Sequence, residues 1–331
     1  MSLLSIRNLR TEFSGPAGIV RAVDGVSLDV APGEIFGIVG ESGCGKSATC
    51  RSILRLFGGA PARVAGGQIL LDGVGDLAAM PERALAQVRG REVAFIFQDP
   101  LTALNPTMRI GRQIAEVILR HRKVSRAEAR EAALGLLRDV HVTSPERRLD
   151  AYPHELSGGL RQRVVIAMAL ALRPRLIIAD EPTTALDVTV QDQILRLLRE
   201  RRDSTGTAII LITHDLGVVS QVCDRMAVMY AGRIVETGAV REVLDHPSHP
   251  YTRALLAALP GQASRGRDLV PIEGSPPGLI APPPGCRFAP RCRLAREDCG
   301  SGPAPGLLPR PGTAPGHLDA CILSEVPDVA S

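Results

Sequence analysis

Apolar and polar residues alternate through most of the first 30 residues, a period of two that is typical of half-buried strands. We therefore expect short antiparallel strands there. The pattern then changes, because Ile35 to Val39 is a continuous apolar run, as in a parallel strand buried on both faces. A helical pattern follows Ser47 and ends near Gly58-Gly59.

Helix-period apolar positions return between residues 110 and 140, among many arginines and glutamates, and predict a helical insert. Buried parallel strands and a closing hairpin are predicted after it. The strand runs are Leu176 to Ala179 and Ala208 to Thr213, and the hairpin joins Met226 to Tyr230 with Arg233 to Val235. Helices that alternate with parallel strands indicate an α/β fold.

The composition shifts after residue 255. Residues 256–331 contain 14 of the 26 prolines and 10 of the 33 glycines, and their one substantial helix candidate, Tyr251 to Leu259, lies at the boundary. Something other than a large apolar core must order such a segment. We expect a domain over residues 1–255, with a helical subdomain at about 101–157, and a loop-rich C-terminal extension over 256–331.

Charge and hydropathy exclude several classes of protein. The formal net charge is +4 and the basic residues are scattered, which argues against a nucleic-acid partner. No apolar run approaches the roughly 20 residues of a membrane-spanning helix, and the N-terminus lacks the features of a signal peptide. We expect a cytoplasmic protein, where a reducing environment disfavours disulfides among the seven cysteines.

Residues 40–47 read Gly-Glu-Ser-Gly-Cys-Gly-Lys-Ser, a match to Gly-x-x-x-x-Gly-Lys-Ser between a predicted strand and a predicted helix. The glycines let backbone N–H groups turn toward phosphates, and the helix N-terminus attracts anions. Lys46, one of only two lysines in the chain, would neutralise β- and γ-phosphate oxygens, and Ser47 would bind Mg²⁺. The predicted nucleoside triphosphate site comprises Gly40, Ser42, Gly43, Gly45, Lys46 and Ser47.

Polar side chains follow three predicted strands. Asp180, at the tip of one strand, is placed to hold Mg²⁺, and Glu181 beyond it to orient or deprotonate the attacking water. His214 follows the next predicted strand, and we expect it to contact the γ-phosphate. Gln98 ends the apolar run Val93 to Phe97 and would contact Mg²⁺ or the water.

Together with Leu156-Ser157-Gly158-Gly159, these motifs resemble the ATP-binding cassette (ABC) ATPases over about residues 1–255. The resemblance implies a P-loop NTPase core with a RecA-like parallel sheet, an N-terminal antiparallel β subdomain and a helical insert. It implies that ATP and Mg²⁺ bind between two subunits, with the signature of one facing the phosphates of the other. The residues it adds to the site are the signature Ser157, Gly158 and Gly159, the D-loop Asp187, and Phe13 as the ring stacked on adenine.

Several short sequence segments narrow the resemblance to the ATPases of the dipeptide, oligopeptide and nickel importers. They lie at residues 97–106, 180–189, 249–256 and 274–278. Leu160 replaces the usual glutamine of the signature, which is typical of the D-type subunit. The resemblance implies a second, F-type ATPase subunit or a second copy, two transmembrane permease subunits and an extracytoplasmic substrate-binding protein. It places the chain at the cytoplasmic face of the membrane, with the cargo open among dipeptides, oligopeptides, glutathione and nickel chelates.

Four of the seven cysteines fall in the tail: Cys286, Cys292, Cys299 and Cys321, with 5, 6 and 21 residues between them. This is neither the Cys-x-x-Cys zinc pattern nor a common ferredoxin spacing. A metal staple is still reasonable for a segment without a core. The resemblance implies a [4Fe–4S] cluster, and zinc or free or disulfide-bonded thiols stay open.

Two other ABC classes are alternatives. Soluble ABC ATPases that act on DNA or ribosomes carry coiled-coil arms, zinc inserts or two cassettes in one chain, and residues 48–156 hold no such insert. An ABC exporter subunit is the other alternative, and the importer-like tail argues against it.

Overall fold

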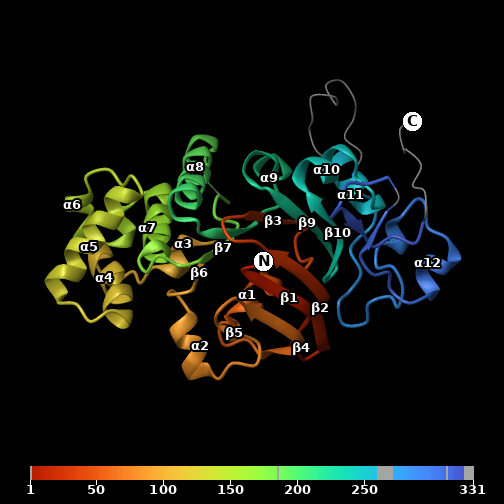
Figure 1. Ribbon diagram of the computed structural model, residues 1–331, viewed down its shortest axis with the longest axis horizontal. Coiled ribbons are helices and arrows are strands. Elements are labelled where there is room, and N and C mark those ends of the chain that lie inside the picture. Colours follow the sequence, from red (N-terminus) through yellow and green to blue (C-terminus); the bar gives the residue numbers. More distant parts are fainter. Residues whose placement is uncertain (1, 185, 259–270, 311, 324–331) are drawn as a thin grey trace. The chain divides into compact units, whose positions relative to one another are not determined.

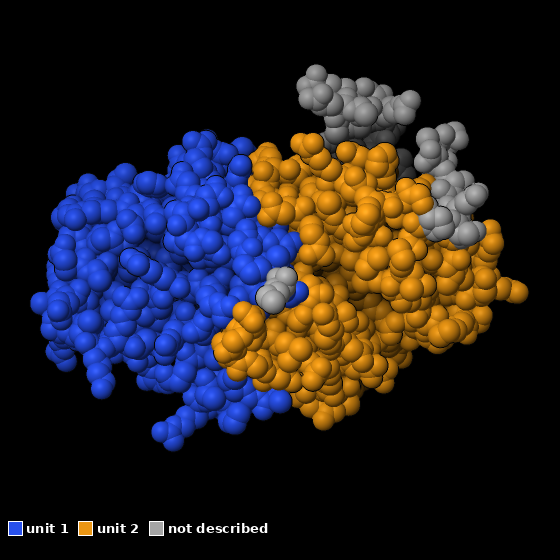
Figure 2. Space-filling view, in the orientation of Figure 1, with its two compact units in different colours: residues 1–3, 30–35, 79–212 blue, residues 4–29, 36–78, 213–331 orange. Residues whose placement is uncertain are grey.

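The computed structural model describes residues 2–184, 186–258, 271–310 and 312–323. The chain forms two compact units, drawn in different colours in Figure 2. Unit 1 comprises residues 1–3, 30–35 and 79–212, and unit 2 comprises residues 4–29, 36–78 and 213–331. Each unit therefore joins segments that lie far apart in the sequence.

The parallel strands of unit 1 are β6 (Val93–Ile96), β7 (Leu176–Asp180) and β8 (Ala208–Ile212), with β7 in the middle. Every residue of β7 and β8 is buried, as their continuous apolar runs predict. The helix α8 (Val188–Thr205) connects these two strands. It ends at Gly206, whose left-handed φ of 68° closes the helix before β8.

The remaining helices of unit 1 include the helices predicted at residues 110–140, and four of them, α4 to α7, group together in Figure 1. The stretch 110–140 forms two helices, because Ser125 and Glu128 form a capping box that starts a new helix. The helices are α2 (Glu82–Val88), α3 (Pro100–Ala103), α4 (Ile110–His121), α5 (Arg126–Asp139), α6 (Pro145–Leu149), the 3₁₀ turn η1 (Pro153–Glu155) and α7 (Gly158–Leu170).

Unit 2 contains the N-terminal antiparallel sheet, in the strand order β2-β1-β4-β5. The first two strands, β1 (Leu4–Gly15) and β2 (Gly18–Val30), confirm the predicted strands but are 12 and 13 residues long rather than short. β4 (Ala62–Leu71) pairs antiparallel with β1 and leads to β5 (Gly75–Asp76). The sequence analysis missed β4, whose alternation is interrupted by Gly66 and Gly67.

The second sheet region of unit 2 begins with β3 (Ile35–Val39), which pairs in parallel with β9 (Arg225–Tyr230). β9 turns into β10 (Arg233–Ala239) at Ala231 and Gly232, whose φ values of 46° and 85° are those of a two-residue hairpin turn. The predicted hairpin is therefore confirmed. The tail adds two short strands that the sequence analysis missed, β12 (Leu318–Asp319) on β10 and then β11 (Leu308–Pro309).

The helices of unit 2 are short. α1 starts at the predicted place but ends at Ile53, five residues early, because Arg55 takes a left-handed φ of 51°. No described helix is both long and apolar enough to cross a membrane. The helices are α1 (Lys46–Ile53), α9 (Leu216–Val222), α10 (Val240–Asp245), α11 (Pro250–Ala257), the 3₁₀ turn η3 (Ala289–Arg291) and α12 (Glu297–Ser301).

An aromatic cluster orders the described part of the tail. Phe288 packs on Tyr230 of β9 and Tyr251 of α11, with ring centroids 5.3 Å away in both cases, and the two tyrosine rings are 4.6 Å apart. All three side chains are buried. Rings from three distant segments therefore replace the large core that the tail composition cannot provide.

We expect Gly111→Ala to destabilise the helical part of unit 1. A Cβ on Gly111 in α4 would lie 2.5 Å from Leu149 Cγ and 2.8 Å from Leu149 O, so the helices must move apart, at a cost of about 2–3 kcal/mol. The matched control is Gly135→Ala in α5, where a Cβ meets nothing within 4 Å and should stabilise by up to about 1 kcal/mol. Chemical denaturation followed by circular dichroism compares them, and equal midpoints would contradict this packing.

Candidate functional site

The loop 40–47 connects β3 to α1, and two of its glycines lie against backbone oxygens. A Cβ would be 2.1 Å from Met229 O at Gly40, where φ is +150°, and 2.3 Å from Ala22 O at Gly45, where φ is +108°. Neither the space nor the φ value suits any other residue. The loop conformation is therefore specified by glycine.

Lys46 lies at the end of this loop as the first residue of α1, and the residue is only 5% exposed. Its ammonium donates hydrogen bonds to Gly40 O at 2.7 Å and to Glu41 O at 3.0 Å. Ser42 and Gly43 are exposed and Ser47 is half-buried in the first turn of α1. This arrangement of a held cation and a helix N-terminus suits an anionic phosphate chain.

In unit 1 the structure brings together two of the predicted residues, Gln98 and Glu181. The register of β6 and β7 pairs Ile96 with Ala179, and Gln98 and Glu181 each lie two residues beyond this pair. Gln98 Nε2 donates to Glu181 Oε2 at 2.8 Å. Asp180, fully buried, is the last residue of β7.

The backbone at Glu181 is unusual, with a φ of +46°. Its N–H donates to Ile212 O on the neighbouring strand at 3.0 Å, which continues the sheet pattern by one residue. Thr184 Oγ1 donates to Glu181 Oε2 at 2.9 Å. Two side-chain donors thus orient this carboxylate, and the sequence analysis missed Thr184.

The signature residues meet the start of α8, also in unit 1. Ser157 caps α7, and its Oγ accepts from Leu160 N at 3.4 Å, while Asp187 caps α8 and accepts from Val190 N at 2.9 Å. A Cβ on Gly159 would lie 2.7 Å from Val190 Cγ1, so the two helices approach closely at this glycine. Ser157 and Gly159 line an open surface groove beside α8.

Two further predicted residues belong to unit 2. Phe13 on β1 is half-buried and packs edge-on against Phe57, with ring centroids 5.9 Å apart. His214 is exposed and follows β8 by two residues. Ala185, in the D-loop beside Asp187, lies outside the described residues.

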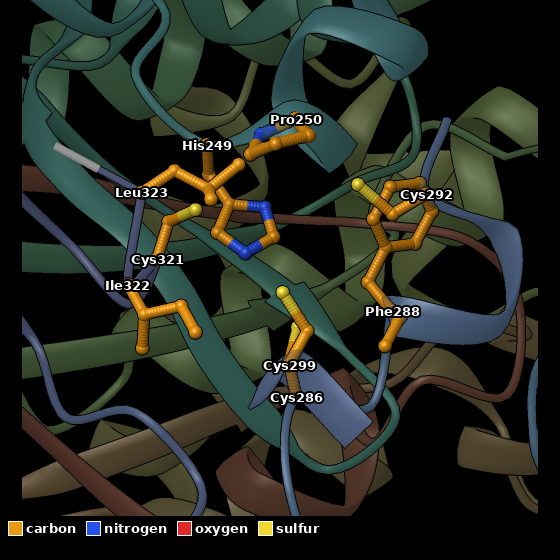
Figure 3. Close-up of a pocket in the computed structure, with 10 residues that line it drawn as sticks. His249, Pro250, Cys286, Phe288, Cys292, Cys299, Cys321, Ile322 and Leu323 are labelled. Atoms are coloured by element: carbon orange, nitrogen blue, oxygen red, sulfur yellow. The ribbon is translucent and has the colours of Figure 1, made fainter. Parts of the chain in front are cut away.

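The four tail cysteines line one small cavity, which also contacts His249 and Phe288 (Figure 3). All four are free thiols, and burial raises the pKa of Cys286, Cys292 and Cys321. Within the described ranges, no group of three or more His, Cys, Asp or Glu side chains stands ready to bind a metal ion. The structure thus gathers the cysteines without closing a coordination site.

His249 adds a polar atom to this cavity. Its Nδ1 accepts from Tyr251 N at 3.0 Å, and burial lowers its pKa to about 4, so the ring is neutral with its proton on Nε2. Nε2 is buried and has no hydrogen-bond partner among the described residues. The ring lies among the cysteines in Figure 3, and no described side chain of the cavity lining accepts a hydrogen bond from this N–H.

Comparison with known proteins identifies the family. Residues 23–184 match the family model described as ABC transporter, and residues 235–299 match the oligopeptide/dipeptide transporter C-terminal region. The chain is 52% identical, over 96% of its length and 94% of the relative's, to the probable peptide ABC transporter ATP-binding protein of Sinorhizobium fredii. This chain belongs to the ABC transporter ATP-binding proteins.

Other proteins similar to this ABC ATPase support the same family assignment. The dipeptide transport ATP-binding protein DppD of Bacillus subtilis is 51% identical, with 88% of this chain and 86% of that protein covered. A dimeric ATP-binding cassette in a post-hydrolysis state with ADP and Pi superposes with a TM-score of 0.64 at 28% identity, covering 72% of this chain and 99% of the other. The predicted α/β cassette fold is confirmed, and as an ABC ATPase the chain hydrolyses ATP.

The sequence analysis missed several residues around the site of this ABC ATPase. Arg291 and Tyr251 contact Glu41 in the loop 40–47, which we call the phosphate loop. Arg291 lies about 250 positions, and Tyr251 about 210 positions, beyond Glu41 in the sequence. In the sequence, His249 and Tyr251 stand out only as part of the segment 249–256, which is typical of peptide importers. No local pattern marks such long-range partners.

We expect Gly45→Ala to destabilise the phosphate loop much more than Gly43→Ala. A Cβ on Gly45 would lie within 3 Å of Ala22 O and Met229 Cε, so the added methyl should cost about 3 kcal/mol in strain and displacement. Gly43 also has a positive φ, +76°, but open space around it, so its replacement should cost only about 1 kcal/mol. Urea unfolding of the full chain measures both, and equal losses would show that the close approach is unimportant.

Proposed function

We propose that this ABC ATPase powers the import of dipeptides or oligopeptides across the cytoplasmic membrane. The observation that carries the proposal is the match of residues 235–299 to the C-terminal region of oligopeptide and dipeptide transporters. The oligopeptide transport ATP-binding protein OppD of Salmonella typhimurium, 47% identical over 97% of this chain, supports the same class of cargo.

In this proposal the chain lies at the cytoplasmic face of the membrane, bound to two transmembrane permease subunits. A second ATPase subunit, an F-type paralogue or a second copy, completes the pair, and an extracytoplasmic binding protein delivers the peptide. The dimeric state of the similar ADP-bound cassette supports the pairing. Ser157, Gly158, Gly159 and Asp187 would then face the partner's nucleotide, with Ser157 and Gly159 lining the open groove beside α8.

Within one subunit, we assign the ATP phosphates to the loop 40–47. Lys46 neutralises the β- and γ-phosphates, His214 contacts the γ-phosphate and Phe13 stacks on the adenine. Hydroxyl, amide and carboxylate oxygens are suitable magnesium ligands, so Ser47, Gln98 and Asp180 would hold Mg²⁺, which supplies charge neutralisation when bound. The bond from Gln98 Nε2 to Glu181 supports this role, because it turns the amide oxygen away from the carboxylate.

Glu181 is the proposed catalytic base. Gln98 and Thr184 donate to the same carboxylate oxygen, Oε2, at 2.8 and 2.9 Å, and so fix the plane of the carboxylate. A carboxylate oriented in this way can accept a proton from water, or align it for attack on the γ-phosphate. Its position directly after the buried Asp180 supports a role beside the metal.

A reconstituted transporter tests this function. In proteoliposomes with permease and ATPase partners, the wild-type chain should drive uptake of labelled peptide with ATP hydrolysis. Glu181→Gln should lower both by about 100-fold or more, because it removes the base, while MgATP still binds. Glu131→Gln, on the exposed surface of α5, is the matched control and should leave both unchanged. Uptake of a nickel chelate or glutathione without peptide, or full hydrolysis by Glu181→Gln, would overturn the assignment.

We also propose that the cysteine cavity holds a [4Fe–4S] cluster. Four thiols that converge from residues 286 to 321 match the donor set of such a cluster. The buried Nε2–H of His249 supports this choice, because a thiolate or sulfide sulfur would accept its hydrogen bond. The ligands would be Cys286, Cys292, Cys299 and Cys321. Their bonds to iron would cross-link the segments of the tail that carry these cysteines.

Metal analysis of the anaerobically purified full chain tests the cluster. We expect about four iron atoms per chain and a brown colour, both lost in Cys292→Ser and Cys321→Ser. Cys223→Ser is the control, because Cys223 does not line the cavity, and it should keep its iron. Zinc in place of iron, or a colourless chain with four titratable tail thiols, would exclude the cluster.

A further inference from the structure

The phosphate loop contains one residue whose side chain and backbone are both held by the C-terminal part of unit 2. Glu41 forms a two-point ion pair with Arg291, with Nη1 to Oε2 at 2.7 Å and Nη2 to Oε1 at 3.2 Å. Its backbone N–H donates to Tyr251 Oη at 3.0 Å. Two independent contacts therefore fix this residue of the loop from outside the loop.

Every N–H group of the Arg291 guanidinium donates a hydrogen bond. Besides Glu41, its guanidinium donates to Tyr230 Oη at 3.3 Å, to Ile272 O at 3.1 Å and from Nε to Glu273 O at 2.9 Å. A guanidinium has five N–H donors, and all five are used. The side chain is only 5% exposed, and the hydrogen bond to Glu41 raises its pKa further. Such a site accepts arginine and excludes lysine.

Tyr251 is equally constrained. Its ring is fully buried against Tyr230 and Phe288, and it is the second residue of α11. Its hydroxyl therefore has little freedom to move when it accepts the hydrogen bond from Glu41 N. Burial raises the pKa of this hydroxyl, so it remains protonated and neutral.

Glu41 connects this network to the lysine of the loop. The carbonyl oxygen of Glu41 accepts a hydrogen bond from Lys46 Nζ at 3.0 Å, next to the one accepted by Gly40 O. A Glu41 that is free to move cannot hold this carbonyl in place, and the ammonium would lose one of its two fixed acceptors. The loop would then have to be ordered when the nucleotide binds, at a cost in affinity.

We propose that Arg291 and Tyr251 are positioning residues of the ATP site, which act through Glu41 on Lys46. The inference rests on the proposed assignment of residues 40–47 as the ATP site. It gives the C-terminal tail a role in nucleotide binding. Because Arg291 directly precedes Cys292, the same backbone that lines the cysteine cavity also carries the ion pair.

Equilibrium binding of MgATP to the full chain, by titration calorimetry, tests the proposal. We expect Arg291→Gln and Glu41→Gln each to weaken binding by about tenfold, and Tyr251→Phe by about threefold, since it loses one hydrogen bond and keeps the ring. Arg291→Lys should not restore affinity, because an ammonium cannot meet five acceptors. The matched control is Arg293→Gln, whose exposed pair with Glu273 lies in the same segment, and it should bind like the wild type.

A double-mutant cycle separates positioning from general destabilisation. The Glu41→Gln/Arg291→Gln double variant should bind MgATP about as well as either single variant, because one contact has been removed from both sides. Fully additive losses, or an affinity of Arg291→Gln equal to that of Arg293→Gln, would overturn the inference. Wild-type affinity in Lys46→Ala would instead overturn the assigned ATP site. If Arg291→Gln fails to fold, Glu41→Gln and Tyr251→Phe decide the question alone.

Discussion

The phosphate loop, residues 40–47, depends on Gly40 and Gly45, because a Cβ at these positions would lie only 2.1 Å from Met229 O and 2.3 Å from Ala22 O. A side chain at either position would push the loop off the strands that carry those oxygens. The loop then places Lys46 on two carbonyl groups at the start of α1. A cation held at a helix N-terminus makes the loop suitable for phosphates, so the proposed ATP site depends on these two close approaches.

The contact between Gln98 and the Glu181 carboxylate depends instead on the register of two strands. β6 and β7 pair Ile96 with Ala179. Gln98 and Glu181 lie two positions beyond this pair on their own segments, so their side chains meet. The signature depends on a third device, the packing of Gly159 against Val190 at the start of α8. Close backbone approach, register and helix packing thus position three sets of residues.

The sequence predicted those features that depend on local chemistry. The buried strands β3, β7 and β8 are continuous apolar runs, and the loop 40–47 is recognised by the spacing of its glycine, lysine and serine residues. Other features depend on partners far along the chain, so no local pattern marks them. The five-residue error at the end of α1 comes from a left-handed Arg55, and the two-residue strand β12 is defined by its pairing with β10 and β11. The contacts of Glu41 with Arg291 and Tyr251 belong to the same class.

The tail shows how a proline-rich segment can be ordered without a large core. Phe288 enters an aromatic cluster with Tyr230 and Tyr251, and a buried hydrogen bond joins His317 Nε2 of the tail to Glu236 Oε1 of β10 at 2.7 Å. These contacts place the cysteine cavity and Arg291 in the same packed region as the phosphate loop's Glu41. The described part of the tail therefore packs onto the rest of unit 2 and is not attached by a linker alone.

A structure of the full chain with Mg²⁺ and a non-hydrolysable ATP analogue tests this account most directly. We predict that the phosphates lie in the loop 40–47 against Lys46, with Glu41 still paired to Arg291 and bound to Tyr251. Phosphates bound elsewhere, or a loop that releases Glu41 from both partners when the nucleotide binds, would contradict it.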